Sequence, residues 1–90
     1  MPRFLVQRTY SQGLHVVPDE NGARQLQAII SRNGERGVTW LHSYVTRDRS
    51  RTFCICEAPD AATIRTVAAA NGLPVDQITE VRVLDPYFHY

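Results

Sequence analysis

The pattern of apolar and polar residues in the middle of the chain predicts a β-hairpin. Residues alternate in character along segments 40–45 and 52–56, and a polar segment, 47–51, separates them. Alternation with a period of two is typical of a strand that has one buried and one exposed face. Because residues 47–51 carry three arginines, we expect a solvated turn at the hairpin tip, with phosphate binding as the less favoured alternative.

The pairing register of this hairpin determines which side chains share a face. A loop centred on Arg49 pairs His42 with Cys56 and Tyr44 with Cys54. This register predicts a core-facing set that consists of Leu41, Val45, Phe53 and Ile55. It predicts an opposite set that consists of Trp40, His42, Tyr44, Cys54 and Cys56. A shift of one residue would divide the second set between the two faces.

The remaining segments predict two helices and two further strands. Residues 3–9 and 78–84 have strand patterns, whereas residues 20–32 and 61–70 have apolar residues at helical spacing. The order strand, helix, strand, strand, helix, strand is the ferredoxin-like pattern of an α+β protein. We therefore expect a four-stranded antiparallel sheet with two helices on one face, formed by a single domain over residues 1–90.

The face of the sheet that the helices leave open is predicted to be apolar and chemically varied. In the last strand, Val81 and Val83 should face the helices. The open face should hold Leu5, Gln7, Trp40, His42, Tyr44, Cys54, Cys56, Glu80 and Arg82. Such a face needs a cover, which could be a second subunit, a ligand or the chain's own tail.

The C-terminal tail, residues 85–90, contains three aromatic residues: Tyr87, Phe88 and Tyr90. One interpretation is that the tail packs back on its own domain. The other is that it helps to form a homodimer, because aromatic residues are enriched in interfaces. Since twofold pairing is the commonest form of oligomer, we expect a homodimer, in the form of a dimeric α+β barrel.

Composition and charge exclude several classes of protein. A net charge of +1 at pH 7 gives no electrostatic case for binding nucleic acid or a membrane surface. No apolar run approaches the roughly 18 residues that a membrane span needs. The chain begins directly with a strand pattern and shows no signal peptide, so we expect a cytoplasmic protein. Cys54 and Cys56 are expected to be free thiols.

The hairpin and its flanks resemble a known bacterial family. The most specific piece is Trp-x-His-Ser-Tyr-Val at residues 40–45, and further matches lie at 7–9, 52–54, 58–60, 71–74, 80–82 and 85–86. The chain is similar to the ferredoxin-like domain-of-unknown-function 4242 family, which includes a dimeric nickel-binding protein. The resemblance implies nickel or another divalent transition metal as cofactor. This chain departs from the family at Gln7, where glutamate is common, and at Thr66-Val67, where a Glu-His pair is common.

The candidate site residues all lie on the predicted open face. The candidate metal ligands are His42, Cys54 and Glu80. Imidazole and thiolate donors suit nickel, zinc or copper. The candidate walls of a binding site are Trp40, Tyr44 and Gln7. The simpler interpretations are that His42 is a hydrogen-bonded sheet residue, that Cys54 is a small core residue, and that Glu80 belongs to an ion pair.

Three functional hypotheses follow. The first is a small metal-binding protein that uses the open face, with nickel as the ion that the resemblance implies. The second is a ligand-binding or enzymatic dimeric barrel in which His42 is an acid–base group that acts on a small molecule. The third is a structural dimerisation module. Because the chain has no glycine-rich phosphate loop and no nucleophile elbow, a non-enzymatic role is favoured.

Overall fold

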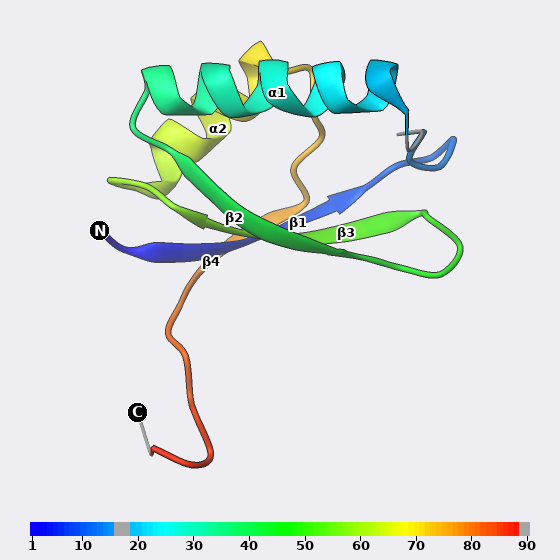
Figure 1. Ribbon diagram of the computed structural model, residues 1–90. Helices are drawn as coiled ribbons and strands as arrows, with labels where there is room; N and C mark the ends of the chain where they lie inside the picture. The colour runs from blue at the N-terminus through cyan, green and yellow to red at the C-terminus, as the bar shows by residue number, and fades with distance from the viewer. Residues whose placement is uncertain (16–18, 89–90) are drawn as a thin grey trace.

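One antiparallel sheet is covered on one side by two helices (Figure 1). The computed structural model describes residues 1–15 and 19–88. In chain order the elements are β1 (Arg3–Thr9), α1 (Glu20–Glu35), β2 (Thr39–Val45), β3 (Arg51–Glu57), α2 (Ala61–Ala70) and β4 (Gln77–Val81). The strand order is β2-β3-β1-β4, and every neighbouring pair is antiparallel. This arrangement confirms the predicted ferredoxin-like α+β fold.

Each helix begins at an aspartate that caps its first turn. The Asp19 carboxylate accepts a hydrogen bond from the backbone N–H of Gly22 at 3.0 Å, and Asp60 accepts one from the N–H of Thr63 at 2.8 Å. Such caps satisfy N–H groups that have no partner within the helix. Neither helix in the described ranges is long and apolar enough to cross a membrane.

Helix α1 continues to Glu35, beyond its predicted end at Arg32. The residue that closes the helix is Gly37, which has φ 76° and donates its N–H to the carbonyl of Gly34 at 3.1 Å. A left-handed residue just past the last turn favours glycine, because other residues clash there. Gly34 therefore stays inside the helix, and the predicted end at Arg32 is wrong.

Strand β4 ends at Val81, although the pattern predicted a strand to Leu84. Val81 lies opposite Arg3, the first residue of β1, so no strand remains for later residues to pair with. Val83 is exposed, and the expectation that it faces the helices is wrong. Figure 1 shows the segment after β4 running away from the sheet on the side opposite the helices.

The turn of the β2–β3 hairpin shifts the register by one residue. Val45, rather than Thr46, lies opposite Thr52. Thr46 belongs to the turn, where its carbonyl accepts a hydrogen bond from the N–H of Arg49 at 2.9 Å. Arg49 has φ 63°, the left-handed conformation that lets the chain reverse there. The predicted pairings of His42 with Cys56 and of Tyr44 with Cys54 are therefore wrong.

Asp48 holds the same turn together. Its carboxylate accepts hydrogen bonds from the backbone and the hydroxyl of Ser50 and from the hydroxyl of Thr46. These bonds favour the charged form and lower the pKa of Asp48 to about 2. The turn is thus tied to a carboxylate that is ionised near neutral pH.

A β-bulge then divides β2 into two parts. Trp40 lies opposite Cys56 but His42 lies opposite Ile55, so Leu41 is the extra residue. Opposed residues share a face of a sheet, and successive residues alternate. The helix-covered side therefore receives Trp40, Cys54 and Cys56, and the open face receives His42, Tyr44, Phe53 and Ile55. The predicted face assignment of the two cysteines, Trp40, Phe53 and Ile55 is wrong.

The predicted faces of the β4 side chains Glu80 and Val81 are also wrong. Glu80 lies opposite Phe4 and so is on the helix side, whereas Val81 lies opposite Arg3 on the open face. Leu5 lies on the open face as predicted, beside Ile55. The core between sheet and helices consists of Phe4, Val6, Val38, Cys54, Cys56, Ala58, Ile64 and Val67.

Candidate functional site

The open face carries an exposed imidazole beside an exposed phenol. The rings of His42 and Tyr44 meet edge to face, with centroids 5.3 Å apart and planes at 87°. Gln7 of β1 lies on the same face. Its side-chain amide nitrogen donates a hydrogen bond to the side-chain oxygen of Gln77 on β4 at 3.4 Å. At one end of this face Glu57 pairs with Arg3 at 2.7 Å, and that hydrogen bond lowers the pKa of the Glu57 carboxyl. His42 and Tyr44 are therefore accessible, whereas Glu57 is already paired.

The three predicted metal ligands are not brought together. His42 is on the open face, Cys54 is buried on the helix side, and Glu80 is on the helix side at the edge strand β4. The expectation that they share one face is wrong. Within residues 1–15 and 19–88, no group of three or more His, Cys, Asp or Glu side chains is placed to hold a metal ion. The donors of one chain therefore do not fit a nickel site.

The two cysteines behave as core residues. Both thiols are free, as expected, and both are buried. Burial raises the pKa of the Cys56 thiol to about 11, and the neighbouring Cys54 contributes in the same direction. Because metals bind the thiolate form, a thiol held protonated is a poor ligand. The Cys54 thiol instead donates to the hydroxyl oxygen of Thr52 at 3.7 Å.

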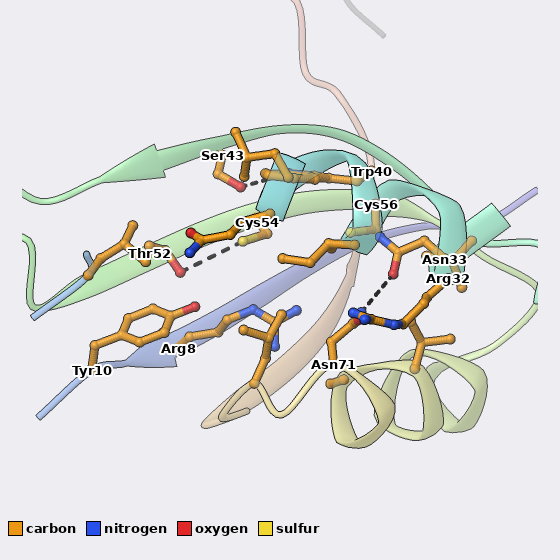
Figure 2. A pocket seen from close by; sticks show the side chains of 18 of the residues that line it. Arg8, Tyr10, Arg32, Asn33, Trp40, Ser43, Thr52, Cys54, Cys56 and Asn71 are labelled. Carbon is orange, nitrogen blue, oxygen red and sulfur yellow. Dashed lines mark hydrogen bonds between the residues drawn. The ribbon is translucent and has the colours of Figure 1, made fainter. Parts of the chain in front are cut away.

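A cavity of about 670 Å³ lies between α1 and the helix-covered side of the sheet (Figure 2). Trp40 lines this cavity, although it was expected to line a pocket on the open face. The indole nitrogen of Trp40 donates to the hydroxyl of Ser43 at 2.8 Å. The other two predicted wall residues, Gln7 and Tyr44, stay on the open face. The predicted binding wall is thus divided between the two sides of the sheet.

Arg8 is the residue at this cavity that the sequence analysis did not single out. It is 7% exposed, lines the cavity, and donates a hydrogen bond to the carbonyl of Pro74 at 2.8 Å. Its place in the alternation was the available signal, because Phe4, Val6 and Arg8 must lie on one side of β1. An arginine that continues a core-facing series indicates a buried cation.

The sequence matches a family of nickel-responsive proteins. The model of the family described as "Nickel responsive protein SCO4226-like" matches residues 4–81. The chain belongs to this SCO4226-like family. The resemblance found in the sequence is therefore confirmed at the level of a nickel-responsive family, while the name domain-of-unknown-function 4242 stays a prediction. No curated protein matches the chain.

A solved structure of an SCO4226-like protein has the same fold. The crystal structure of SCO4226 from Streptomyces coelicolor A3(2) is similar to this chain with a TM-score of 0.69 and 20% sequence identity. The similarity covers 90% of this chain and 96% of that one. At this identity the likeness supports the fold alone, and the function must be argued from the residues of this SCO4226-like protein.

Proposed function

We propose that this protein is a homodimer that binds nickel between the open sheet faces of two copies, with His42 of each copy as a ligand. The observation that carries the proposal is an exposed imidazole on an uncovered, partly apolar face, in a chain whose family is described as nickel responsive. Nickel is a metal that imidazole ligands suit.

The apolar side chains of the open face support the pairing of two copies. Leu5, Phe53, Ile55 and Val81 share that face, and no helix covers it (Figure 1). Beyond the sheet, Leu84 is 82% exposed and Tyr87 is 85% exposed. Apolar surface of this kind favours association, and a self-complementary patch leads to twofold pairing. A second copy would cover both the face and the tail.

The incomplete donor set of one chain supports the same proposal. Within residues 1–15 and 19–88, the donors of one chain form no group of three that could hold a metal ion, and a single imidazole does not make a metal site. A twofold axis repeats every donor, so His42 of the partner copy would supply the missing imidazole. The edge of Tyr44 against His42 would restrict the orientation of the imidazole ring.

The cavity on the other side of the sheet does not support an acid–base role for His42. His42 faces away from it, and Arg8, Trp40 and the two cysteines line it instead. The hypothesis of an enzyme that uses His42 in an apolar pocket is therefore less favoured than the metal-binding one.

Nickel titration of the untagged protein tests the proposal. We expect saturable binding of one nickel ion per dimer by isothermal titration calorimetry, with zinc titrated in parallel. We expect the His42→Ala variant to weaken nickel binding by at least about 10-fold, the scale of effects seen around metal ligands. His15→Ala is the matched control, because His15 lies in a loop and its ring nitrogen contacts the carbonyl of Gln12 at 2.7 Å.

Two results would overturn the proposal. One is wild-type protein that shows no saturable nickel binding. The other is a folded His42→Ala variant that binds nickel as tightly as the His15→Ala control. Circular dichroism of both variants establishes that the fold is intact.

A further inference from the structure

Arg8 is a buried cation without a carboxylate partner. In the part of the chain that the structure describes, no Asp or Glu oxygen lies within 4.0 Å of its guanidinium. Among the described residues, its guanidinium donates a hydrogen bond to the carbonyl of Pro74. The guanidinium stays charged at any physiological pH, and an uncompensated buried charge is unfavourable. An anion that entered the cavity would supply the missing counter-charge.

The cavity beside Arg8 combines positive charge with apolar walls. Leu26 and Ile29 of α1 and Val67 of α2 form part of its lining. Two more arginines, Arg32 and Arg49, lie on its border, and none of its described lining residues is Asp or Glu. Its volume of about 670 Å³ falls within the range of roughly 300 to 1,000 Å³ typical of small-molecule pockets. This charge balance favours an anion that has a sizeable apolar body.

Arg8 and two hydroxyl-bearing side chains gather at one end of the cavity. Figure 2 shows Arg8, Tyr10 and Thr52 together at that end, Trp40 and Cys56 further along, and Arg32, Asn33 and Asn71 at the other end. Burial raises the pKa of the Tyr10 phenol. The phenol is therefore protonated near neutral pH and, with the guanidinium, offers hydrogen-bond donors to an anionic head group.

We propose that the cavity between α1 and the sheet binds an amphipathic organic carboxylate, whose head group pairs with Arg8 and whose apolar body lies along Trp40 and the aliphatic side chains of the helices. A guanidinium matches a carboxylate in both shape and charge, because two N–H groups can donate to its two oxygens. The site is on the face opposite His42 and is independent of nickel.

Trp40 provides a direct signal for this binding, because it is the only tryptophan of the chain and lines the cavity. Decanoate and 1-decanol, titrated below their aggregation limits, form a matched pair of probes that differ in head-group charge. We expect decanoate to change the Trp40 fluorescence saturably and to bind more tightly than 1-decanol. Isothermal titration calorimetry gives the stoichiometry, which should be one decanoate per chain.

Two variants test the assignment. Arg8→Gln removes the charge, and we expect decanoate affinity to fall about 10- to 100-fold, which corresponds to the loss of a charged hydrogen bond, while 1-decanol binding is unchanged. Arg47→Gln is the matched control, because Arg47 is exposed at the hairpin tip and does not line the cavity. Ala28→Phe places a ring at an exposed position of α1 that borders the cavity, and should weaken both probes.

The proposal is overturned if decanoate and 1-decanol bind equally well to wild-type protein, or if neither one binds. It is also overturned if folded Arg8→Gln keeps the affinity of Arg47→Gln for decanoate. Should Arg8→Gln fail to fold, the wild-type comparison of the two probes and the Ala28→Phe variant decide the question.

Discussion

At the scale of the residue, one extra position in β2 determines the chemistry of both faces of the sheet. Leu41 is the extra residue between Trp40 and His42. In a regular strand without this bulge, Trp40 and His42 would face the same way. The bulge places the imidazole on the open face, while Trp40 stays on the helix side with the two thiols. The sulfur and nitrogen donors are thereby kept apart.

We predict that the Cys56 thiol is unreactive while the protein is folded. The Cys54→Ala variant leaves Cys56 as the single thiol, and its reaction with a disulfide reagent at pH 8 should be slow and become fast in guanidinium chloride. The reason is burial, which raises the thiol pKa to about 11 and so removes the reactive thiolate. A single exposed thiol introduced by Tyr44→Cys in a cysteine-free background is the control.

The raised pKa of the Cys56 thiol also predicts that the folded protein loses stability at high pH. The thiol titrates near 9.0 when unfolded and near 11 when folded, so the unfolded state loses its proton first. The stabilising effect is fully present below about pH 9 and is lost as the pH rises towards 11. Fast labelling of folded protein at pH 8 would contradict both expectations.

At the scale of the element, side chains at the C-terminal ends of the two helices hold α1 beside α2. The amide nitrogen of Asn71 donates to the amide oxygen of Asn33 at 3.1 Å, and Arg32 donates to the amide oxygen of Asn71 at 3.0 Å. Asn33 is buried, so its side chain depends on this partner. These hydrogen bonds help to hold α1 in place, because a cavity rather than packed side chains separates much of α1 from the sheet.

We predict that Asn71→Ala destabilises the protein by about 1 to 3 kcal/mol, because it leaves the buried Asn33 amide unsatisfied. The free energy of unfolding from urea titration measures the loss. Asn21→Ala is the matched control, since Asn21 is exposed in the first turn of α1 and should change the stability much less. Equal stability of the two variants would show that the link between the helices contributes nothing.

At the scale of the whole molecule, the two sides of the sheet differ in what covers them. The helix side contains a cavity lined by Arg8 and bordered by Arg32 and Arg49, and the open face displays Leu5, Phe53 and Ile55 without a cover. The tail leaves the sheet on the uncovered side (Figure 1). The proposed dimer would use the open face and the tail, and the proposed carboxylate would use the cavity.

We predict that Ile55→Glu separates the dimer into folded monomers. Ile55 lies on the open face in a central strand of the sheet, opposite Leu5, so two carboxylates would be buried without partners in the dimer. We expect the dissociation constant to rise by at least about 100-fold, measured by light scattering coupled to size exclusion. Ile30→Glu is the control, because Ile30 is an exposed residue of α1 on the other side of the sheet. A variant that still has the mass of the wild-type dimer would exclude the open face as the interface.

Local sequence pattern was enough to predict the order of the elements and where the helices begin. Hydrophobic periodicity is a local property, so two helices and four strands could be identified without any knowledge of their packing. The caps at Asp19 and Asp60 are equally local, because each aspartate bonds to a backbone N–H three residues later. The exposed imidazole of His42 was likewise assigned correctly to the open face.

Which donor side chains lie together depends on strand pairing and packing. The bulge at Leu41 and the turn at Thr46 depend on how β2 fits β3, and a period of two makes any such shift exchange the faces of a strand. This exchange moved Trp40, Cys54 and Cys56 to the helix side and brought them into one cavity with Arg8. Side chains far apart in the chain become neighbours through pairing and packing, which local pattern does not specify.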